Sequence, residues 1–264
     1  MTGIPIFKCC ACGRCCSNIR GLGSKEEKEF IMEYGHGKLP VIELIDADRL
    51  TFPLWNFEAR RFREYERKAG IDAGIVPSRG VMDLKSGKFI VIAYQMTADA
   101  ACPFLLKSGK CGIYDTKRAY VCHLFPLKRS PYLRLEAESK DIFGKCHTLD
   151  KFKDLFDFSE KNVLLKQLYG SLGDALLNAV QHDIVIEWSN KAVMEMMRIG
   201  LIRPAMNYPV DFLMKRIENS IHIDLSDFIV ESGFKTREEM DRITERFENL
   251  DGARERLSKD SIIN

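Results

Sequence analysis

Five of the nine cysteines of this 264-residue chain lie within ten residues near its start, in the stretch FKCCACGRCC. Cys9, Cys12 and Cys15 are each separated by two residues, and Cys16 follows directly. This spacing lets a tight turn aim successive sulfurs at one centre, and Gly13 gives the backbone the freedom to make that turn. Thiolates gathered in this way bind metal ions or iron–sulfur clusters.

The spacing also bears on the kind of centre. Zinc sites usually take one C-x-x-C pair from each of two loops. Bacterial ferredoxin motifs instead begin C-x-x-C-x-x-C and recruit a further cysteine that precedes proline, as Cys102 precedes Pro103 here. The pattern therefore favours an iron–sulfur cluster of the 4Fe–4S type over zinc. Cys16 lies outside this motif, so Cys15 and Cys16 serve two centres or one of them is structural.

The remaining cysteines follow in residues 101–147. A turn at residues 107–110 is expected to bring Cys102 and Cys111 together, and a helical turn from Asp115 to return Cys122 to the same side. Cys10 interrupts the regular spacing and is set aside. Eight candidate ligands remain, enough for two four-thiolate sites: Cys9, Cys12, Cys15, Cys16, Cys102, Cys111, Cys122 and Cys146.

Two histidines stand beside these cysteines. His123 follows Cys122 and His147 follows Cys146. Each is a possible ligand or a hydrogen-bond partner of a sulfur, and a surface or structural histidine is the commoner alternative. The roles of Cys10, His123 and His147 stay open.

As a set, the segments C-x-x-C-x-x-C-C, C-P-F-L, C-G-I-Y and C-H-L-F-P resemble the CxxCxxCC (YkgJ-type) cysteine-cluster family over about residues 7–147. The family is described as zinc- or iron-chelating. The resemblance implies chelating roles for Cys9, Cys12, Cys15, Cys16, Cys102, Cys111 and Cys122. This chain departs from the family pattern at Ala119, where proline is common, and at His123, where arginine is common.

Some members of that family are flagellin lysine N-methylases, which implies S-adenosylmethionine-dependent methyl transfer as one possible activity. No motif in the chain supports the cofactor: the C-x-x-x-C-x-x-C spacing of radical enzymes is absent, and no glycine-rich loop follows a clear strand. The chain also shows no convincing base or nucleophile. Whether it is an enzyme is left open, with an iron–sulfur oxidoreductase or a protein lysine N-methyltransferase as the candidates. The alternative is a zinc-stabilised interaction module without catalysis.

Around these motifs the sequence predicts an α+β fold. Residues 1–149 are expected to form a cysteine-cluster domain with short strands and helices, and residues 150–264 a helical region packed on or next to it. Expected elements of the first part are a helix from the capping box of Ser24 and Glu27 to about residue 34, a helix over 55–68, and a hairpin of 81–84 with 89–96. Expected helices of the second part are an apolar-periodic segment around 152–168, then 174–202, 210–219 and 226–232, and a last one after the capping box of Thr236 and Glu239.

The composition limits the environment and the partners. A net charge of +2 with 30% charged residues gives no basis for a nucleic-acid partner, so an unidentified protein or small molecule is expected. No apolar run is long enough to span a bilayer, and the first residues do not resemble a signal peptide. The expected location is the cytoplasm, where clustered cysteines are more often metal ligands than disulfides.

Overall fold

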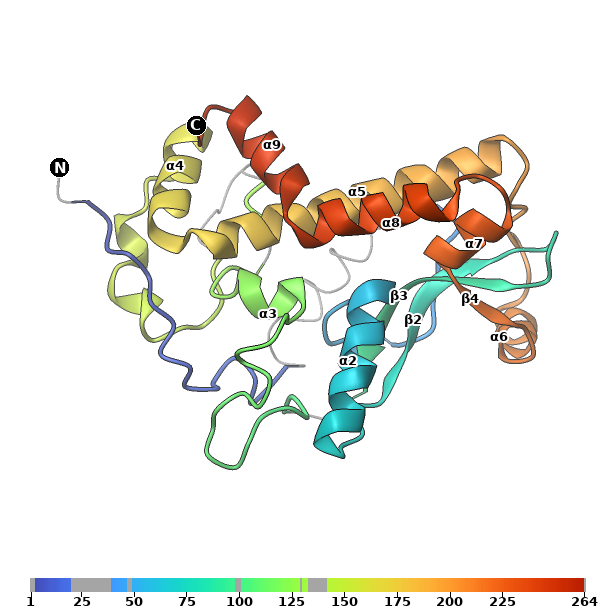
Figure 1. The fold of residues 1–264 in the computed structure, drawn as a ribbon, viewed down its shortest axis with the longest axis horizontal. Coiled ribbons are helices and arrows are strands. Elements are labelled where there is room, and N and C mark those ends of the chain that lie inside the picture. Colours follow the sequence, from blue (N-terminus) through green and yellow to red (C-terminus); the bar gives the residue numbers. More distant parts are fainter. Residues whose placement is uncertain are drawn as a thin grey trace. The chain divides into compact units, whose positions relative to one another are not determined.

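A computed structural model describes residues 3–19, 39–46, 49–97, 101–128, 130–132 and 142–263. The elements are β1 (Ile42–Glu43), α2 (Asn56–Ala69), β2 (Ile75–Met82), β3 (Phe89–Met96), α3 (Tyr120–Leu124), η4 (Leu149–Lys151), η5 (Lys153–Leu155), α4 (Lys161–Leu172), α5 (Asp174–Arg198), α6 (Val210–Glu218), β4 (His222–Asp224), α7 (Leu225–Glu231), α8 (Arg237–Glu248) and α9 (Asp251–Lys259) (Figure 1). The fold is α+β, as predicted, with one small sheet and a C-terminal half that is mostly helical.

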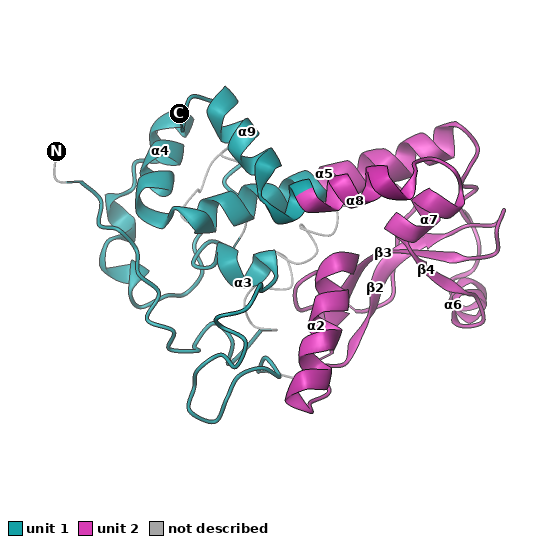
Figure 2. Ribbon diagram, in the orientation of Figure 1, with its two compact units in different colours: residues 1–23, 100–185, 246–264 teal, residues 24–99, 186–245 magenta. Residues whose placement is uncertain are grey.

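The chain forms two compact units (Figure 2). Unit 1 contains Met1–Gly23, Ala100–Val185 and Arg246–Asn264, and unit 2 contains Ser24–Asp99 and Ile186–Glu245. Each unit therefore combines stretches from both sides of residue 150, because α9 returns to the core of unit 1 while the second half of α5 belongs to unit 2. The division into a cysteine-cluster domain of residues 1–149 and a helical region of residues 150–264 stays a prediction.

Unit 2 is built on the sheet, whose strand order is β1-β2-β3-β4. β3 is buried along its whole length, and both α2 and α7 contact it. A strand covered on both faces is expected to be apolar at nearly every position, as the sequence FIVIAYQM is. The predicted hairpin is confirmed, although β2 begins earlier than expected and its register with β3 shifts around Arg79.

The C-terminal half contains one strand that sequence analysis missed. β4 pairs in parallel with β3, with Ile90 opposite Ile223. Three residues are too few to show an alternating pattern, and pairing with a distant strand stabilises them instead. The segment predicted as entirely helical is therefore interrupted by β4 before α7 begins.

Several predicted helices are confirmed, including α2, α5, α6 and α7. The capping box before α8 is also present: Glu239 N–H donates to Thr236 Oγ1 at 3.2 Å, and Thr236 N–H donates to the Glu239 carboxylate at 2.8 Å. The helix predicted from Ser24 lies outside the described residues. Among the helices that are described, none has the length and apolarity that a bilayer crossing requires.

Unit 1 has its own hydrophobic core. Buried residues from the loops before α4, from α4 and α5, and from α9 form one cluster, which includes Leu127, Leu149, Leu165, Val180 and Leu257. Ile4 and Phe7 pack against this cluster from the N-terminal segment. The core thus holds the segment that carries the first five cysteines.

In unit 2 a buried carboxylate organises the turn after β2. Asp83 is fully buried and accepts hydrogen bonds from the Ser86 hydroxyl at 2.6 Å and from the backbone N–H groups of Arg203 at 2.8 Å, Ser86 at 2.9 Å and Lys85 at 3.1 Å. Burial alone would raise the pKa of Asp83, but these hydrogen bonds outweigh it and lower the pKa. The carboxylate therefore joins the hairpin to the segment after α5.

Replacing Asp83 by Asn should destabilise unit 2 by about 1–3 kcal/mol, because the amide nitrogen cannot accept the hydrogen bonds that it replaces. Because the folded-state pKa is lowered, the contribution of the carboxylate is present above its unfolded pKa and is lost as the pH falls through the folded value. The loss of stability caused by Asp83→Asn should therefore be smaller at acidic pH than at neutral pH.

Urea unfolding followed by tryptophan fluorescence measures this effect, since both tryptophans, Trp55 and Trp188, belong to unit 2. Asp241→Asn, on the exposed surface of α8, is the control. Equal stability of the two variants at neutral pH would contradict the role assigned to Asp83.

Candidate metal centre

The cysteines at the start of the chain are positioned by backbone contacts with α4 rather than by an element of their own. Phe7 N–H donates to the carbonyl of Ser171 at 2.8 Å, and the Ser171 hydroxyl donates to the carbonyl of Pro5 at 2.6 Å. Residues 14–18 then form a turn, in which Cys16 N–H donates to the carbonyl of Gly13 at 2.9 Å. The segment is anchored at one end and folded back at the other.

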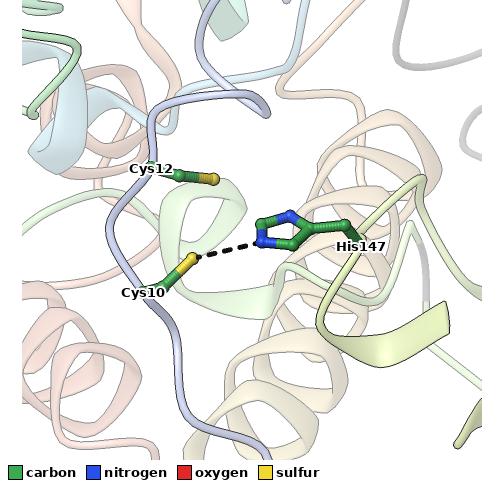
Figure 3. Close-up of side chains that lie close together, drawn as sticks. All are labelled: Cys10, Cys12 and His147. Carbon is green, nitrogen blue, oxygen red and sulfur yellow. Dashed lines mark hydrogen bonds between the residues drawn. The ribbon is translucent and has the colours of Figure 1, made fainter. Parts of the chain in front are cut away.

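Among the described residues, Cys10, Cys12 and His147 form a group of possible metal ligands (Figure 3). Their ligand atoms all lie within 4.8 Å of one another, and all three residues are exposed. Cys10 Sγ is 3.8 Å from His147 Nε2 and 3.9 Å from Thr148 Oγ1. We call these three residues the outer group. Two thiolates and an imidazole are ligands that thiophilic ions prefer, so the outer group could hold a metal ion.

The two thiols of the outer group influence each other. Hydrogen bonds from the side chain of Cys12 and from Thr148 lower the pKa of Cys10. The Arg14 N–H favours the Cys12 thiolate, but partial burial and the neighbouring Cys10 outweigh it and raise the pKa of Cys12. Cys10 is therefore the thiol of this pair that ionises first.

A second set of cysteines lies deeper. Cys15 Sγ and Cys16 Sγ are 3.7 Å apart, and Cys102 N–H donates to the carbonyl of Cys16 at 2.7 Å. The Cys102 thiol also interacts electrostatically with Cys111 and Cys15, and burial together with these neighbours raises its pKa to about 11. We call Cys15, Cys16, Cys102 and Cys111 the inner group. All four are half-buried.

The pKa of Cys15 is raised as well, first by its hydrogen bond with Cys16 and then by burial, while Arg118 acts in the opposite direction. Protonated thiols packed this closely favour binding of a cation, because an ion replaces the protons and removes the repulsion between sulfurs.

The predicted turn at residues 107–110 is confirmed. Leu106 N–H donates to the carbonyl of Lys110 at 2.8 Å, and Leu105 pairs with Cys111 across the turn. Gly13 lies directly against this turn: a Cβ added to it would lie 2.1 Å from the carbonyl oxygen of Gly109. With φ of +70°, Gly13 also has a backbone conformation that other residues rarely adopt.

Cys9 is exposed. Its thiol accepts the Ala11 N–H at 3.4 Å. The charge on Cys9 is the main cause that raises the pKa of Tyr114, followed by burial and a hydrogen bond with the same thiol. The Arg118 guanidinium lies 4.4 Å from the centre of the Tyr114 ring. Cys9 therefore interacts with Tyr114 in this arrangement.

Cys122 and Cys146 are the remaining candidate ligands. Cys122 is half-buried on α3, a helix that begins at Tyr120 and not at Asp115 as expected. Cys146 packs against the hydrophobic core of unit 1, which is the ordinary place of a structural cysteine. Their assignment as metal ligands stays a prediction, as does that of the other candidate cysteines.

The structure thus brings together residues that sequence analysis had separated. Cys10 interrupts the regular spacing of the cysteines, and the sequence leaves the role of His147 open. Cys10 and His147 are 137 residues apart in the sequence. The spacing of neighbouring cysteines therefore does not reveal that the two residues are in contact. The signal that pointed toward it was the position of His147 directly after a cysteine.

No family model matches the chain, and neither a curated protein nor a solved structure shows detectable similarity to it. The assignment of function therefore depends on the residues and geometry described above.

In metal-free, reduced protein, Cys10 should react with iodoacetamide before Cys102. Cys10 is exposed and its pKa is lowered, whereas the pKa of about 11 for Cys102 leaves little thiolate at pH 8. After allowance for the greater nucleophilicity of the more basic thiolate, the rate difference should be about tenfold or more. Peptide mapping by mass spectrometry at timed intervals measures both rates. Equal reaction rates at pH 8 would contradict the environments assigned to the Cys10 and Cys102 thiols.

Gly13→Ala should separate the N-terminal turn from the turn at residues 107–110, since its Cβ would collide with Gly109. We expect faster amide hydrogen exchange in both turns and weaker metal binding. Gly170→Ala is the matched control, because Gly170 is exposed on α4 with no atom within 4 Å of the added Cβ. The control should gain about 0.5–1 kcal/mol of stability. If amide hydrogen exchange in Gly13→Ala is unchanged in both turns, Gly13 does not lie in close contact with Gly109.

Proposed function

We propose that this chain is a metal-binding protein whose clustered cysteines hold a single thiophilic divalent ion of the zinc class at the outer group. The observation that carries the proposal is the convergence of Cys10, Cys12 and His147, whose ligand atoms lie within 4.8 Å of one another. Two thiolates with one imidazole are a familiar zinc ligand set.

The distances support one ion rather than a cubane at this group. Around a tetrahedral zinc ion, a sulfur and a nitrogen ligand lie about 3.6 Å apart, close to the 3.8 Å between Cys10 Sγ and His147 Nε2. In an iron–sulfur cubane each thiolate binds a different iron, so its sulfurs are spread more widely. An imidazole is also uncommon as a ligand of a four-iron cluster, where cysteines are the rule.

The outer group has three protein ligands and is exposed. A structural zinc site normally has four protein ligands and is closed, while a site with three leaves a position for water or another molecule. The arrangement supports binding of an accessible ion over a purely structural role.

The iron–sulfur interpretation remains the second candidate, because the spacing of Cys9, Cys12 and Cys15 is that of a ferredoxin motif. A redox or S-adenosylmethionine-dependent role, including that of a flagellin lysine N-methylase, would follow from that candidate and from the resemblance to the CxxCxxCC family. A third candidate is a zinc-stabilised interaction module without catalysis. It would require closed sites, in which four protein ligands surround each ion.

Metal analysis of anaerobically purified protein separates these candidates. We expect a colourless protein that binds zinc stoichiometrically, with affinity reduced more than about 100-fold in Cys12→Ser and His147→Ala. His222→Ala, which removes an exposed imidazole from unit 2, should bind as the unchanged protein does.

A brown protein containing iron and sulfide would replace the zinc proposal by the iron–sulfur one. A protein that neither retains metal nor binds added zinc would exclude metal binding altogether.

A further inference from the structure

The segment that carries α6 is fixed at both of its ends to strands of unit 2. Before the helix, Ala205 N–H donates to the carbonyl of Met82 at the end of β2, at 2.9 Å. After the helix, the carbonyl of Ile221 accepts the N–H of Phe89 at the start of β3, also at 2.9 Å. In the sequence α6 lies between these two contacts (Figure 1), so it has one side toward the protein and one toward solvent.

The solvent side of α6 carries an aromatic pair. Ile217 is buried and Leu213, one turn before it, is half-buried. In contrast, Phe212 is 51% exposed, and Tyr208 in the turn before the helix is 41% exposed. Their rings stack, with centroids 5.7 Å apart and planes 17° from parallel. A single exposed apolar side chain needs no explanation, but contiguous exposed aromatic rings are typical of an interaction surface.

Two charges of opposite sign lie beside this pair. Asp211 and Lys215 are exposed, and residues four apart lie on the same side of a helix. Neither side chain belongs to an ion pair in the part of the chain that the structure describes. Both are therefore available to a partner. We call Tyr208, Asp211, Phe212 and Lys215 the α6 face.

The charge pattern of α6 distinguishes between possible partners. Nucleic acids and anionic lipid surfaces attract a face with an excess of positive charge. In α6, however, Asp211 and Glu218 balance Lys215 and Arg216. An apolar centre beside one acidic and one basic side chain is instead complementary to a second copy of itself.

We propose that the chain forms a two-fold symmetric dimer through the α6 face, with the two copies of α6 antiparallel. When the symmetry axis passes midway between Asp211 and Lys215 along the helix, the carboxylate of each copy lies opposite the ammonium group of the other. Phe212 is then next to the axis, so the two aromatic pairs meet at the centre of the interface. An apolar centre with a charged rim is the usual composition of a protein interface.

The size of the face sets the strength of this dimer. One helix of nine residues forms a smaller interface than stable dimers have, so we expect a dissociation constant on the order of 10–100 µM. The inference goes beyond the proposed function and does not depend on it, because α6 belongs to unit 2 and the ligands of the outer group to unit 1.

Sedimentation velocity of the full-length, reduced protein from about 5 to about 300 µM brackets this range of dissociation constants and measures the monomer–dimer equilibrium. Phe212→Ser should weaken dimerisation about tenfold or more. Leu155→Ser, which changes an exposed apolar residue of unit 1, should have no effect. Cys12→Ser should dimerise as the unchanged protein does, because the interface contains no thiol or metal ion. Circular dichroism checks that each variant is folded.

Exchange of the charges tests the antiparallel arrangement. Asp211→Lys and Lys215→Asp should each weaken self-association about tenfold or more, because like charges then face each other twice in the dimer. An equimolar mixture of these two variants should form a heterodimer, since every facing pair is again of opposite sign. Asp241→Lys, which makes the same change of charge on the exposed surface of α8, is the control and should dimerise normally.

A chain that stays monomeric over the whole concentration range would overturn the inference, while the proposed metal binding would stand. If that monomer sediments with phosphatidylserine vesicles and Phe212→Ser does not, the α6 face binds a membrane surface instead. Dimers that persist unchanged in Phe212→Ser would show that another surface is used. Absence of a heterodimer in the mixture of charge variants would overturn the antiparallel two-fold arrangement.

Discussion

The hydrogen bond from Cys102 N–H to the carbonyl of Cys16, 2.7 Å long, is the contact on which the cysteine-rich part of the molecule depends. It joins two segments that are far apart in the sequence and have little regular secondary structure. Next to it, a side chain at Gly13 would collide with the carbonyl oxygen of Gly109. Backbone contacts of this kind fix the positions of these two cysteine-bearing segments relative to each other.

Around this contact the thiols are held by the core of unit 1. Phe7 packs against that core, and its backbone N–H donates a hydrogen bond to the carbonyl of Ser171 in α4. On the other side, Leu149 is fully buried in the same core, which places His147 near Cys10. The hydrophobic core thus determines where the exposed ligands meet, although none of the ligands of the outer group is itself buried. Metal binding and the packing of these loops are consequently coupled, because the ion would replace protons on thiols that already lie close together.

The structure could be predicted from the sequence where the residue pattern of a single segment determines its conformation. β3 was predictable because a strand covered on both faces must be apolar throughout, and the start of α8 because Thr236 and Glu239 satisfy each other's backbone N–H groups. The turn between Cys102 and Cys111 was predictable from its glycine and polar residues. β4 was not predictable, because three residues are too few to show an alternating pattern. Its pairing partner β3 is also far away in the sequence. The same limit applies to Cys10, because its partner His147 is distant in the sequence and is brought to it by the core of unit 1.

The central claim is that thiolates and an imidazole of this chain bind individual metal ions. X-ray absorption spectroscopy at the zinc edge of the loaded protein tests it most directly. The account predicts a first shell that contains sulfur at about 2.3 Å and nitrogen at about 2.0–2.1 Å, with the nitrogen contribution reduced in His147→Ala. A shell of oxygen and nitrogen alone would contradict the claim, because it would show that zinc binds elsewhere on the chain.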